Sequence, residues 1–155
     1  MKKTFLLLTL LFCCFFSYSQ TYFTGKVIAI KDGDTVVVLD SLNKQTTLRL
    51  AEIDCPEKNQ PFGTKAKQFT SQEIFSKTIR YKVYDVDRYG RTVAQVYYDD
   101  NKYLSAEIIK HGMGWHYKKY STSKELAQLE ITARKNKTGL WIDTNPIEPS
   151  QWRKK

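Results

Sequence analysis

Five short runs rich in β-branched and aromatic residues restrict what this chain can fold into. An amphipathic segment follows the third run, and two more helical segments follow the fifth. A doubly wound parallel sheet would alternate strand and helix throughout, so this order excludes that fold. The order favours an α+β fold, namely a five-stranded OB-fold barrel with three helices. We expect the strands at residues 21–30, 35–39, 45–53, 79–86 and 92–98.

The first helical segment is identified by the spacing of its apolar residues. Phe62, Ala66, Phe69 and Ile74 fall on one stripe, which predicts a helix over 61–76 that buries this stripe in the core. A proline is tolerated in the first turn of a helix, so we place residue 61 there.

The other two helices are shorter or more polar, and their ends are marked by local signals. A helix over 103–110 is expected to end just before Gly112. A further helix is expected over 123–136, where Thr122 and Glu125 resemble a capping box.

The first residues read as a targeting segment rather than as part of the fold. Two lysines precede an apolar run over 5–16, and a small residue, a tyrosine and a small residue follow at 17–19. This pattern predicts a secretory signal peptide over residues 1–19, cut before Gln20, and one domain over 20–155. The apolar run is shorter than the roughly 20 residues that a spanning helix needs. We therefore expect an exported protein, secreted or periplasmic, without stable membrane insertion after cleavage.

Two alternatives for this leader stay open. One is a membrane anchor that is never cut. The other is a lipoprotein that uses Cys13 or Cys14, although Phe12 is bulky for the position before a lipidation cysteine. With both cysteines in the leader, the mature domain keeps Cys55 alone and has no internal disulfide. Its own core must stabilise it, and we expect a monomer.

The charge of the chain points to a polyanionic partner. Lys and Arg total 25 against 16 Asp and Glu, a net charge of +9, and only two of these lysines belong to the leader. A hydrophobic content of 41% excludes a disordered basic tail. Nucleic acid and acidic surfaces both fit such a charge.

Three polar clusters stand at the ends of expected strands, where a barrel would bring them to one edge. Carboxylates bind hard cations and guanidinium groups bind phosphates. Hydrolysis of a phosphodiester needs both, together with a base that deprotonates water. The clusters are Asp32, Asp34 and Thr35; Arg49, Asp54 and Glu57; and Asp87, Arg88 and Arg91.

The segments IKDGDT at 30–35, LRLAEIDCPE at 48–57 and DRYGR at 87–91 resemble the three signatures of the thermonuclease (staphylococcal-nuclease-like) family. The resemblance extends through HGMGW at 111–115 and GLW at 139–141. It implies an OB-fold enzyme that hydrolyses DNA and RNA with Ca²⁺ and leaves 3′-phosphate and 5′-hydroxyl ends.

The resemblance also implies roles for single residues. Arg49 and Arg91 would bind the scissile phosphate, and Glu57 would act as the general base. The metal ligands would be Asp34, Asp54 and the backbone carbonyl of Cys55. Supporting positions would be Asp32, Thr35 and Asp87, with weaker substrate contacts from Tyr89 and Tyr120.

Two features set this chain apart from a simple match. A threonine is frequent where Cys55 stands, and a thiolate there would attract softer metals. Arg49 and Asp54 are an odd number of residues apart, so in one straight strand they would face opposite sides. Either the strand bulges, or Asp54 already lies beyond it, which Pro56 favours.

Each cluster also has a purely structural interpretation. The DGD segment can be only a hairpin turn, and Arg49 can form a structural salt bridge with Asp54 or Glu57. We expect His111 and His116 to be peripheral. Two alternatives to an enzyme remain: a non-catalytic OB-fold nucleic-acid-binding module derived from such a nuclease, and a basic cell-surface interaction protein.

Overall fold

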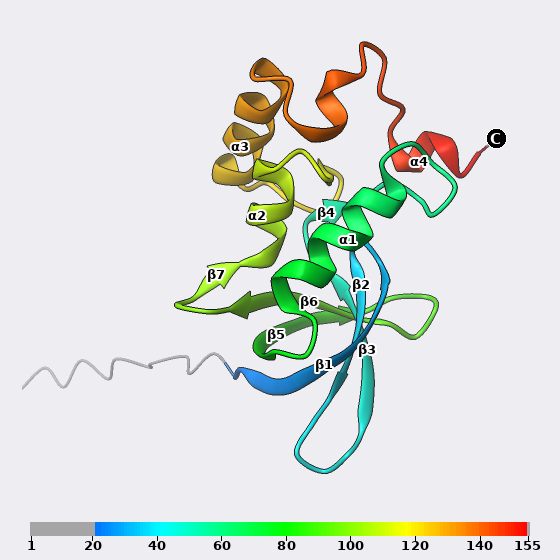
Figure 1. Cartoon of the computed structure of the whole chain (residues 1–155). Coiled ribbons are helices and arrows are strands. Elements are labelled where there is room, and N and C mark those ends of the chain that lie inside the picture. The colour runs from blue at the N-terminus through cyan, green and yellow to red at the C-terminus, as the bar shows by residue number, and fades with distance from the viewer. Residues whose placement is uncertain (1–20, 155) are drawn as a thin grey trace, which may run out of the picture.

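The computed structural model describes residues 21–154, and the predicted signal peptide over 1–19 lies outside them. Five strands build the barrel: β1 (Phe23–Asp32), β2 (Thr35–Leu39), β3 (Gln45–Leu50), β5 (Thr78–Val86) and β6 (Thr92–Tyr98). They pair antiparallel in the order β3-β2-β1-β5-β6, and a parallel pairing of β3 with β6 closes the barrel (Figure 1). The structure thus confirms the five-stranded OB-fold barrel.

Three main helices accompany this barrel, as the sequence predicts: α1 (Gly63–Ile74), α2 (Leu104–Lys110) and α3 (Lys124–Lys135). Helix α1 packs on β1, while α2 and α3 pack on each other beside β6 and the short strand β8 (Figure 1). The smaller elements are β4 (Ile53–Asp54), β7 (Lys102–Tyr103), β8 (Trp115–His116), a 3₁₀ turn (Gly139–Ile142) and α4 (Pro149–Trp152). No helix within residues 21–154 is long and apolar enough to cross a membrane.

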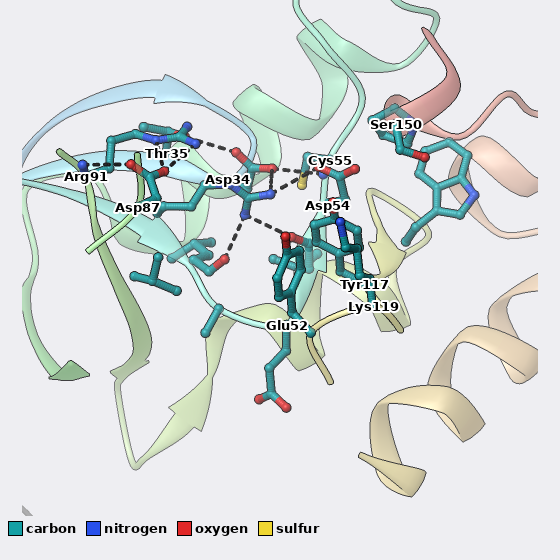
Figure 2. Close-up of a pocket in the computed structure, with 18 of the residues that line it drawn as sticks. Asp34, Thr35, Glu52, Asp54, Cys55, Asp87, Arg91, Tyr117, Lys119 and Ser150 are labelled. Carbon is teal, nitrogen blue, oxygen red and sulfur yellow. Dashed lines mark hydrogen bonds and ion pairs between the residues drawn. The ribbon is translucent and has the colours of Figure 1, made fainter. Parts of the chain in front are cut away.

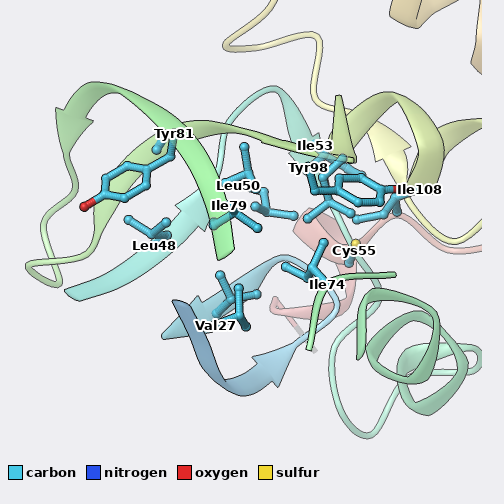
Figure 3. Packing of buried hydrophobic residues seen from close by; sticks show 14 of the residues in the cluster. Val27, Leu48, Leu50, Ile53, Cys55, Ile74, Ile79, Tyr81, Tyr98 and Ile108 are labelled. Atoms are coloured by element: carbon cyan, nitrogen blue, oxygen red, sulfur yellow. The ribbon is translucent and has the colours of Figure 1, made fainter. Parts of the chain in front are cut away.

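The core fills the barrel and the space under α1 and α2. Valine, leucine and isoleucine side chains of the strands meet Ile74 of α1 and Ile108 of α2 (Figure 3), and Ala66 of α1 belongs to the same cluster. Ala66 and Ile74 belong to the predicted helical stripe and are fully buried. A smaller cluster of Trp115, Ala133, Leu140 and Trp141 holds the C-terminal part of the chain against the body.

Several predicted boundaries need correction. Helix α1 begins at Gly63, so residue 61 precedes it, and Phe62 adopts a left-handed conformation with φ of 68°. The N-cap of α3 is Ser123, whose hydroxyl accepts a hydrogen bond from the Leu126 N–H, so the capping box predicted from Thr122 is wrong. The DGD segment is a hairpin, but Asp32 is still the last residue of β1 and pairs with Thr35.

The largest correction concerns the third predicted strand. Strand β3 ends at Leu50, and a turn at Ala51–Glu52 separates it from β4. Glu52 has a φ of 67°, a conformation that is costly for a residue with a Cβ. Because of this turn Asp54 lies beyond β3, which is one of the two arrangements that the odd spacing from Arg49 allowed.

Candidate active site

A cleft of about 1310 Å³ opens at the barrel edge where β1 passes into β2 and β3 into β4. Its walls come from these turns, from the β5–β6 hairpin, from the 115–120 segment and from the C-terminal segment. All site residues predicted from the sequence line this cleft: Asp32, Asp34, Thr35, Arg49, Asp54, Cys55, Glu57, Asp87, Tyr89, Arg91 and Tyr120.

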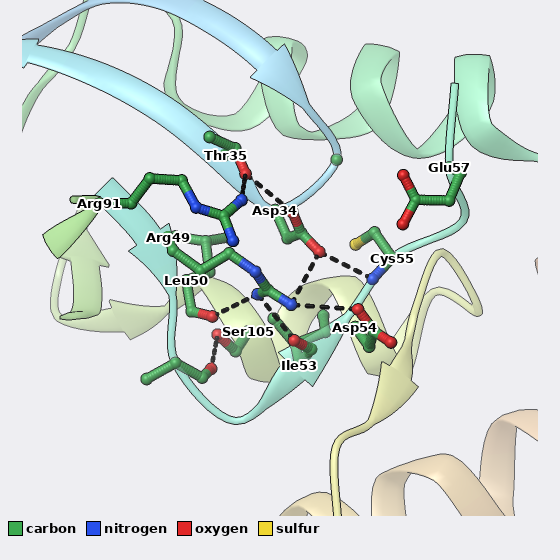
Figure 4. Close-up of polar contacts among 12 residues, drawn as sticks. Asp34, Thr35, Arg49, Leu50, Ile53, Asp54, Cys55, Glu57, Arg91 and Ser105 are labelled. Carbon is green, nitrogen blue, oxygen red and sulfur yellow. Dashed lines mark hydrogen bonds and ion pairs between the residues drawn. The ribbon is translucent and has the colours of Figure 1, made fainter. Parts of the chain in front are cut away.

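Arg49 is the centre of the polar contacts. Its Nη1 donates to the carbonyl oxygens of Leu50 at 2.7 Å and Ile53 at 2.8 Å, so it ties together the two sides of the β3–β4 turn (Figure 4). Its Nη2 donates to Asp54 Oδ1 at 3.1 Å and lies 3.3 Å from Asp34 Oδ2. Both N–H groups of Nη1 are therefore hydrogen-bonded, and Nη2 faces two carboxylates. In the part of the chain that the structure describes, the Nε–H has no partner and can bind a further ligand.

Asp34 and Asp54 are buried carboxylates drawn together by this guanidinium. Asp34 Oδ2 also accepts a hydrogen bond from the Cys55 N–H at 2.9 Å, which brings the backbone of residue 55 beside it. Burial raises the pKa of Asp54, and its bonds to Arg153 and Arg49 oppose this rise. Burial alone would lower the pKa of Arg49, but the two aspartates raise it above its ordinary value.

The second predicted arginine approaches from the β5–β6 hairpin. Arg91 forms a close pair with Asp87, with Nε and Nη2 both 2.7 Å from Asp87 Oδ2. Its Nη1 donates to Thr35 Oγ1 at 3.3 Å, and Thr35 Oγ1 donates to Asp34 Oδ1 at 3.0 Å. Figure 2 shows Arg91, Asp87 and Thr35 together on one side of the cleft. Arg91 is less enclosed than Arg49, and each of its terminal nitrogens keeps one N–H without a hydrogen-bond partner within residues 21–154.

Glu57 stands where the chain leaves β4 for α1. Its side chain points toward Cys55 and Asp54 (Figure 4) and is 39% exposed. The pKa of Asp32 is raised, mainly by burial and then by the charges of Asp34 and Glu57, which line the same cleft.

The donor set suits a hard cation. Two buried carboxylates lie near one guanidinium, with the backbone of Cys55 alongside, and oxygen ligands are what Ca²⁺ and Mg²⁺ prefer. Within residues 21–154 no group of three or more His, Cys, Asp or Glu side chains is close enough to form a complete cage. A cation here would therefore depend on carbonyl and water oxygens as well as on Asp34 and Asp54.

The Cys55 thiol takes no part in this donor set. Its side chain packs into the core, close to Gly33 and Gly114, where an added Cβ would come within about 3.1 Å of the sulfur. Burial raises the pKa of this thiol well above its usual value. The hypothesis of a soft-metal thiolate therefore does not fit the structure, because the group stays a neutral, enclosed thiol.

Aromatic side chains flank the cleft on two sides. Tyr89 is 68% exposed at the hairpin tip with Arg88 against its ring, and Tyr120 is 64% exposed beside Tyr117. Exposed rings next to cations are typical of surfaces on which nucleic-acid bases stack. The contacts predicted for Tyr89 and Tyr120 thus have the required exposure.

His116 is not peripheral, in contrast to the prediction. It is buried in the cleft wall, and its Nε2 lies 2.8 Å from Ser121 Oγ, which donates to Glu52 Oε1 at 2.7 Å. Since the Ser121 proton goes to Glu52, His116 must donate through Nε2. Its Nδ1 is buried without a hydrogen-bond partner within the described residues. The network links the β3–β4 turn to the 115–120 segment.

Sequence reasoning also missed Arg153 and Gln60. Arg153 follows α4, yet its guanidinium contacts Asp54 and Glu57. Gln60 connects the loop of Glu57 to the C-terminal segment. A contact between residues this far apart leaves no local pattern in the sequence, so nothing in the spacing could have identified it.

Comparisons with known proteins identify similar sequences among nucleases. Residues 47–143 match the family model described as staphylococcal nuclease homologue. The chain is 44% identical over 147 residues to an "Uncharacterized endonuclease" of Haemophilus influenzae, covering 95% of this chain and 82% of that protein. It is 37% identical over 129 residues to an "Uncharacterized endonuclease" of Escherichia coli O157:H7, covering 83% and 84%. It is 38% identical over 143 residues to a "Micrococcal nuclease" of Shigella flexneri, covering 85% and 81%.

Proposed function

This chain belongs to the staphylococcal nuclease family, and we propose that it is an exported, calcium-dependent endonuclease that hydrolyses DNA and RNA. The relatives support a nuclease-type hydrolase with a nucleic-acid substrate. One observation carries the finer proposal: guanidinium groups and carboxylates from four separate segments meet in one cleft.

The proposed chemistry divides the work among these residues. Arg91 binds the scissile phosphate through its free N–H groups, and Arg49 contributes its Nε–H while it holds the two aspartates in place. Removing one such donor from a transition state costs on the order of 3 kcal/mol, about a hundredfold in rate. Glu57 accepts the proton of the attacking water, since its carboxylate is more exposed than those of Asp34 and Asp54.

Asp34, Asp54 and the carbonyl of Cys55 would hold Ca²⁺. When bound, the cation supplies a positive charge that neutralises the phosphate and stabilises the charge of the transition state. Thr35 and Asp87 support this arrangement, because Thr35 links Arg91 to Asp34 and Asp87 fixes Arg91. By likeness to the family, the products carry 3′-phosphate and 5′-hydroxyl ends.

The substrate is held through its backbone and by stacking. The surplus of basic residues, including Lys118 and Lys119 in the cleft wall, attracts the phosphates. Stacking of bases on Tyr89 and Tyr120 is compatible with any base, so little sequence preference is expected. Export through a signal peptide over residues 1–19 is part of the proposal, and the N-terminal sequence of the protein recovered from culture medium or periplasm tests it: it should begin at Gln20.

The central experiment is plasmid and RNA digestion by the purified protein in Ca²⁺, in EDTA and with Glu57→Gln. Cleavage is expected in Ca²⁺ and is lost in EDTA and in the variant. Glu148→Gln is a matched control, because Glu148 also lines the cleft but its side chain has no hydrogen bond or ion pair within the described residues. The fragments should be labelled by polynucleotide kinase without prior phosphatase treatment, because their 5′ ends carry hydroxyls.

Two outcomes would reject this function. Wild-type protein that binds single-stranded DNA but never cleaves it over a range of Ca²⁺ would be a non-catalytic OB-fold module. Protein that neither cleaves nor binds nucleic acid at low salt would be a basic interaction protein of another kind.

A further inference from the structure

The C-terminal segment reaches into the cleft through Arg153. Its Nη1 donates to Glu57 Oε1 at 2.5 Å and to Asp54 Oδ1 at 3.3 Å, and its Nη2 donates to Asp54 Oδ2 at 3.0 Å. One guanidinium thus bridges the proposed general base and a proposed metal ligand. Arg153 lies beyond the residues that match the family model, which end at 143.

Glu57 depends on this contact for its orientation. Within the described residues its carboxylate has no hydrogen bond or ion pair other than the one with Arg153. A glutamate that is 39% exposed and follows a loop proline has several rotamers available. Without Arg153, the like charge of Asp54 would favour rotamers that turn Glu57 toward solvent.

The backbone of Glu57 is tied to the same segment by a second route. Gln60 is buried, its Oε1 accepts from the Glu57 N–H at 3.1 Å, and its Nε2 donates to the Ile147 carbonyl at 2.6 Å. The main chain and the side chain of Glu57 are therefore both positioned by residues 147–153.

Packing holds the C-terminal segment in place without the ion pair. Trp152 borders a small hollow with Gln60, Phe62, Trp115 and Leu140, and Pro149 is buried at the start of α4. In Figure 1, α4 lies beside the loop that leads into α1. Replacing the guanidinium should consequently leave the path of the chain unchanged.

The Arg153 contacts still leave room for a cation. A carboxylate offers about four lone-pair sites. Asp54 uses one for Arg49 and two for Arg153, so one remains. Arg153 and a metal ion can thus bind Asp54 together, and Arg153 need not leave for the site to be loaded.

From these contacts we infer that Arg153 is a positioning residue for hydrolysis: it holds the Glu57 carboxylate beside Asp54, where the attacking water must be deprotonated. This inference rests on the proposed function. The C-terminal segment thereby completes an active site whose other parts come from the barrel.

The test compares Arg153→Gln and Arg153→Lys with wild type in steady-state cleavage of a fluorogenic oligonucleotide at saturating Ca²⁺. Lys154→Gln is the matched control, since it removes the same charge one residue further on and Lys154 forms no ion pair within residues 21–154. Misplacing a reacting group by about 1 Å can cost roughly a hundredfold in rate. In Arg153→Gln we expect kcat to fall about 10- to 100-fold while KM changes by less than about threefold. In Arg153→Lys, which keeps the positive charge, we expect kcat to be partly restored.

Added guanidinium ion at millimolar concentration should restore part of the kcat of Arg153→Gln and leave that of Lys154→Gln unchanged. Isothermal titration with Ca²⁺ and thermal unfolding, run on every variant, separate metal binding and folding from positioning. An unchanged or higher kcat in Arg153→Gln overturns the inference, and a higher kcat together with tighter Ca²⁺ binding would make Arg153 a competitor of the cation. Wild-type protein without cleavage would instead reject the proposed function itself.

Discussion

Arg49 Nη2 and Asp54 Oδ1 lie 3.1 Å apart across the Ala51–Glu52 turn, in a pair whose side chains are 12% and 4% exposed. Without Arg49 the buried Asp34 loses its ion pair, although Asp54 still pairs with Arg153. Breaking a buried pair by removing one partner costs about 3–5 kcal/mol. Arg49→Ala is therefore expected to lower the free energy of unfolding by about that amount and to abolish cleavage. Urea titration followed by circular dichroism, alongside the digestion assay, measures both. Lost activity with unchanged stability would show that Arg49 does not organise the two aspartates.

Arg91 should behave differently, because it is more exposed and its partner Asp87 lies on the same hairpin. We expect Arg91→Ala to lower kcat about 100- to 1,000-fold while the free energy of unfolding changes by less than about 1 kcal/mol. Arg88→Ala is the control, since Arg88 stacks on Tyr89 at the exposed tip. Equal losses in the two variants would indicate a general effect of charge on the hairpin.

Added salt should lower kcat/KM because it weakens the binding of the nucleic-acid substrate. Each phosphate contact with a lysine or arginine releases counterions, so log(kcat/KM) should fall linearly with log salt. Lys118→Gln with Lys119→Gln should reduce the slope by about one to two units. The measurement is cleavage of a single-stranded oligonucleotide from about 50 to 200 mM salt at fixed Ca²⁺. A flat response would contradict an electrostatic cleft.

Stability should depend on pH through His116. Burial lowers the pKa of His116, and Lys118 lowers it further, while Glu130 and Glu52 oppose the shift. Between this lowered value and the ordinary value of about 6.5, the unfolded chain binds a proton that the native chain does not. The free energy of unfolding should therefore rise with pH through this window and be fully gained above about 6.5. Urea titrations at a series of pH values should show a smaller rise in His116→Gln and an unchanged one in His111→Gln.

The Cys55 thiol should resist chemical modification. It is buried with a raised pKa, so a thiol reagent should react with the native protein only as fast as it unfolds. Reaction kinetics in increasing urea test this. Cys55→Thr should keep the Ca²⁺ dependence. Zn²⁺, a softer metal, should affect cleavage equally in this variant and in wild type, and cleavage that resists Zn²⁺ only in the variant would restore the soft-metal hypothesis.

The sequence predicted the barrel well where local pattern and burial agree. Strands β2 and β6 have the predicted limits of 35–39 and 92–98. Helix α1 buries Ala66 and Ile74 of the predicted stripe, whereas Phe69 is half-buried and Phe62 precedes the helix. The three polar clusters were correctly expected at one edge, because the ends of strands must meet when a barrel closes. The roles assigned to these residues stay predictions.

The features that the sequence did not predict are determined by tertiary contacts. The turn at Glu52 requires a positive φ on a residue that gives no turn signal, and Arg49 stabilises it through two carbonyl groups. Helix α1 begins later than predicted because Phe62 adopts a left-handed conformation that cannot belong to the helix, and Gln60 before it bonds to the C-terminal segment. Likewise the contact of Arg153 depends on the whole chain being folded.

The parallel pairing of β3 with β6 sets Arg49 opposite Val93, two residues after Arg91. The hydrogen bonds between β3 and β6 that close the barrel therefore also fix the position of Arg91 relative to Arg49. A shift of β6 by one residue in its pairing with β3 would turn Arg91 to the other face of the sheet. The cleft would then be incomplete even though the sequence is unchanged. Insertions in the 87–91 hairpin should consequently be far less tolerated than insertions in the 40–44 loop at the opposite end of β2.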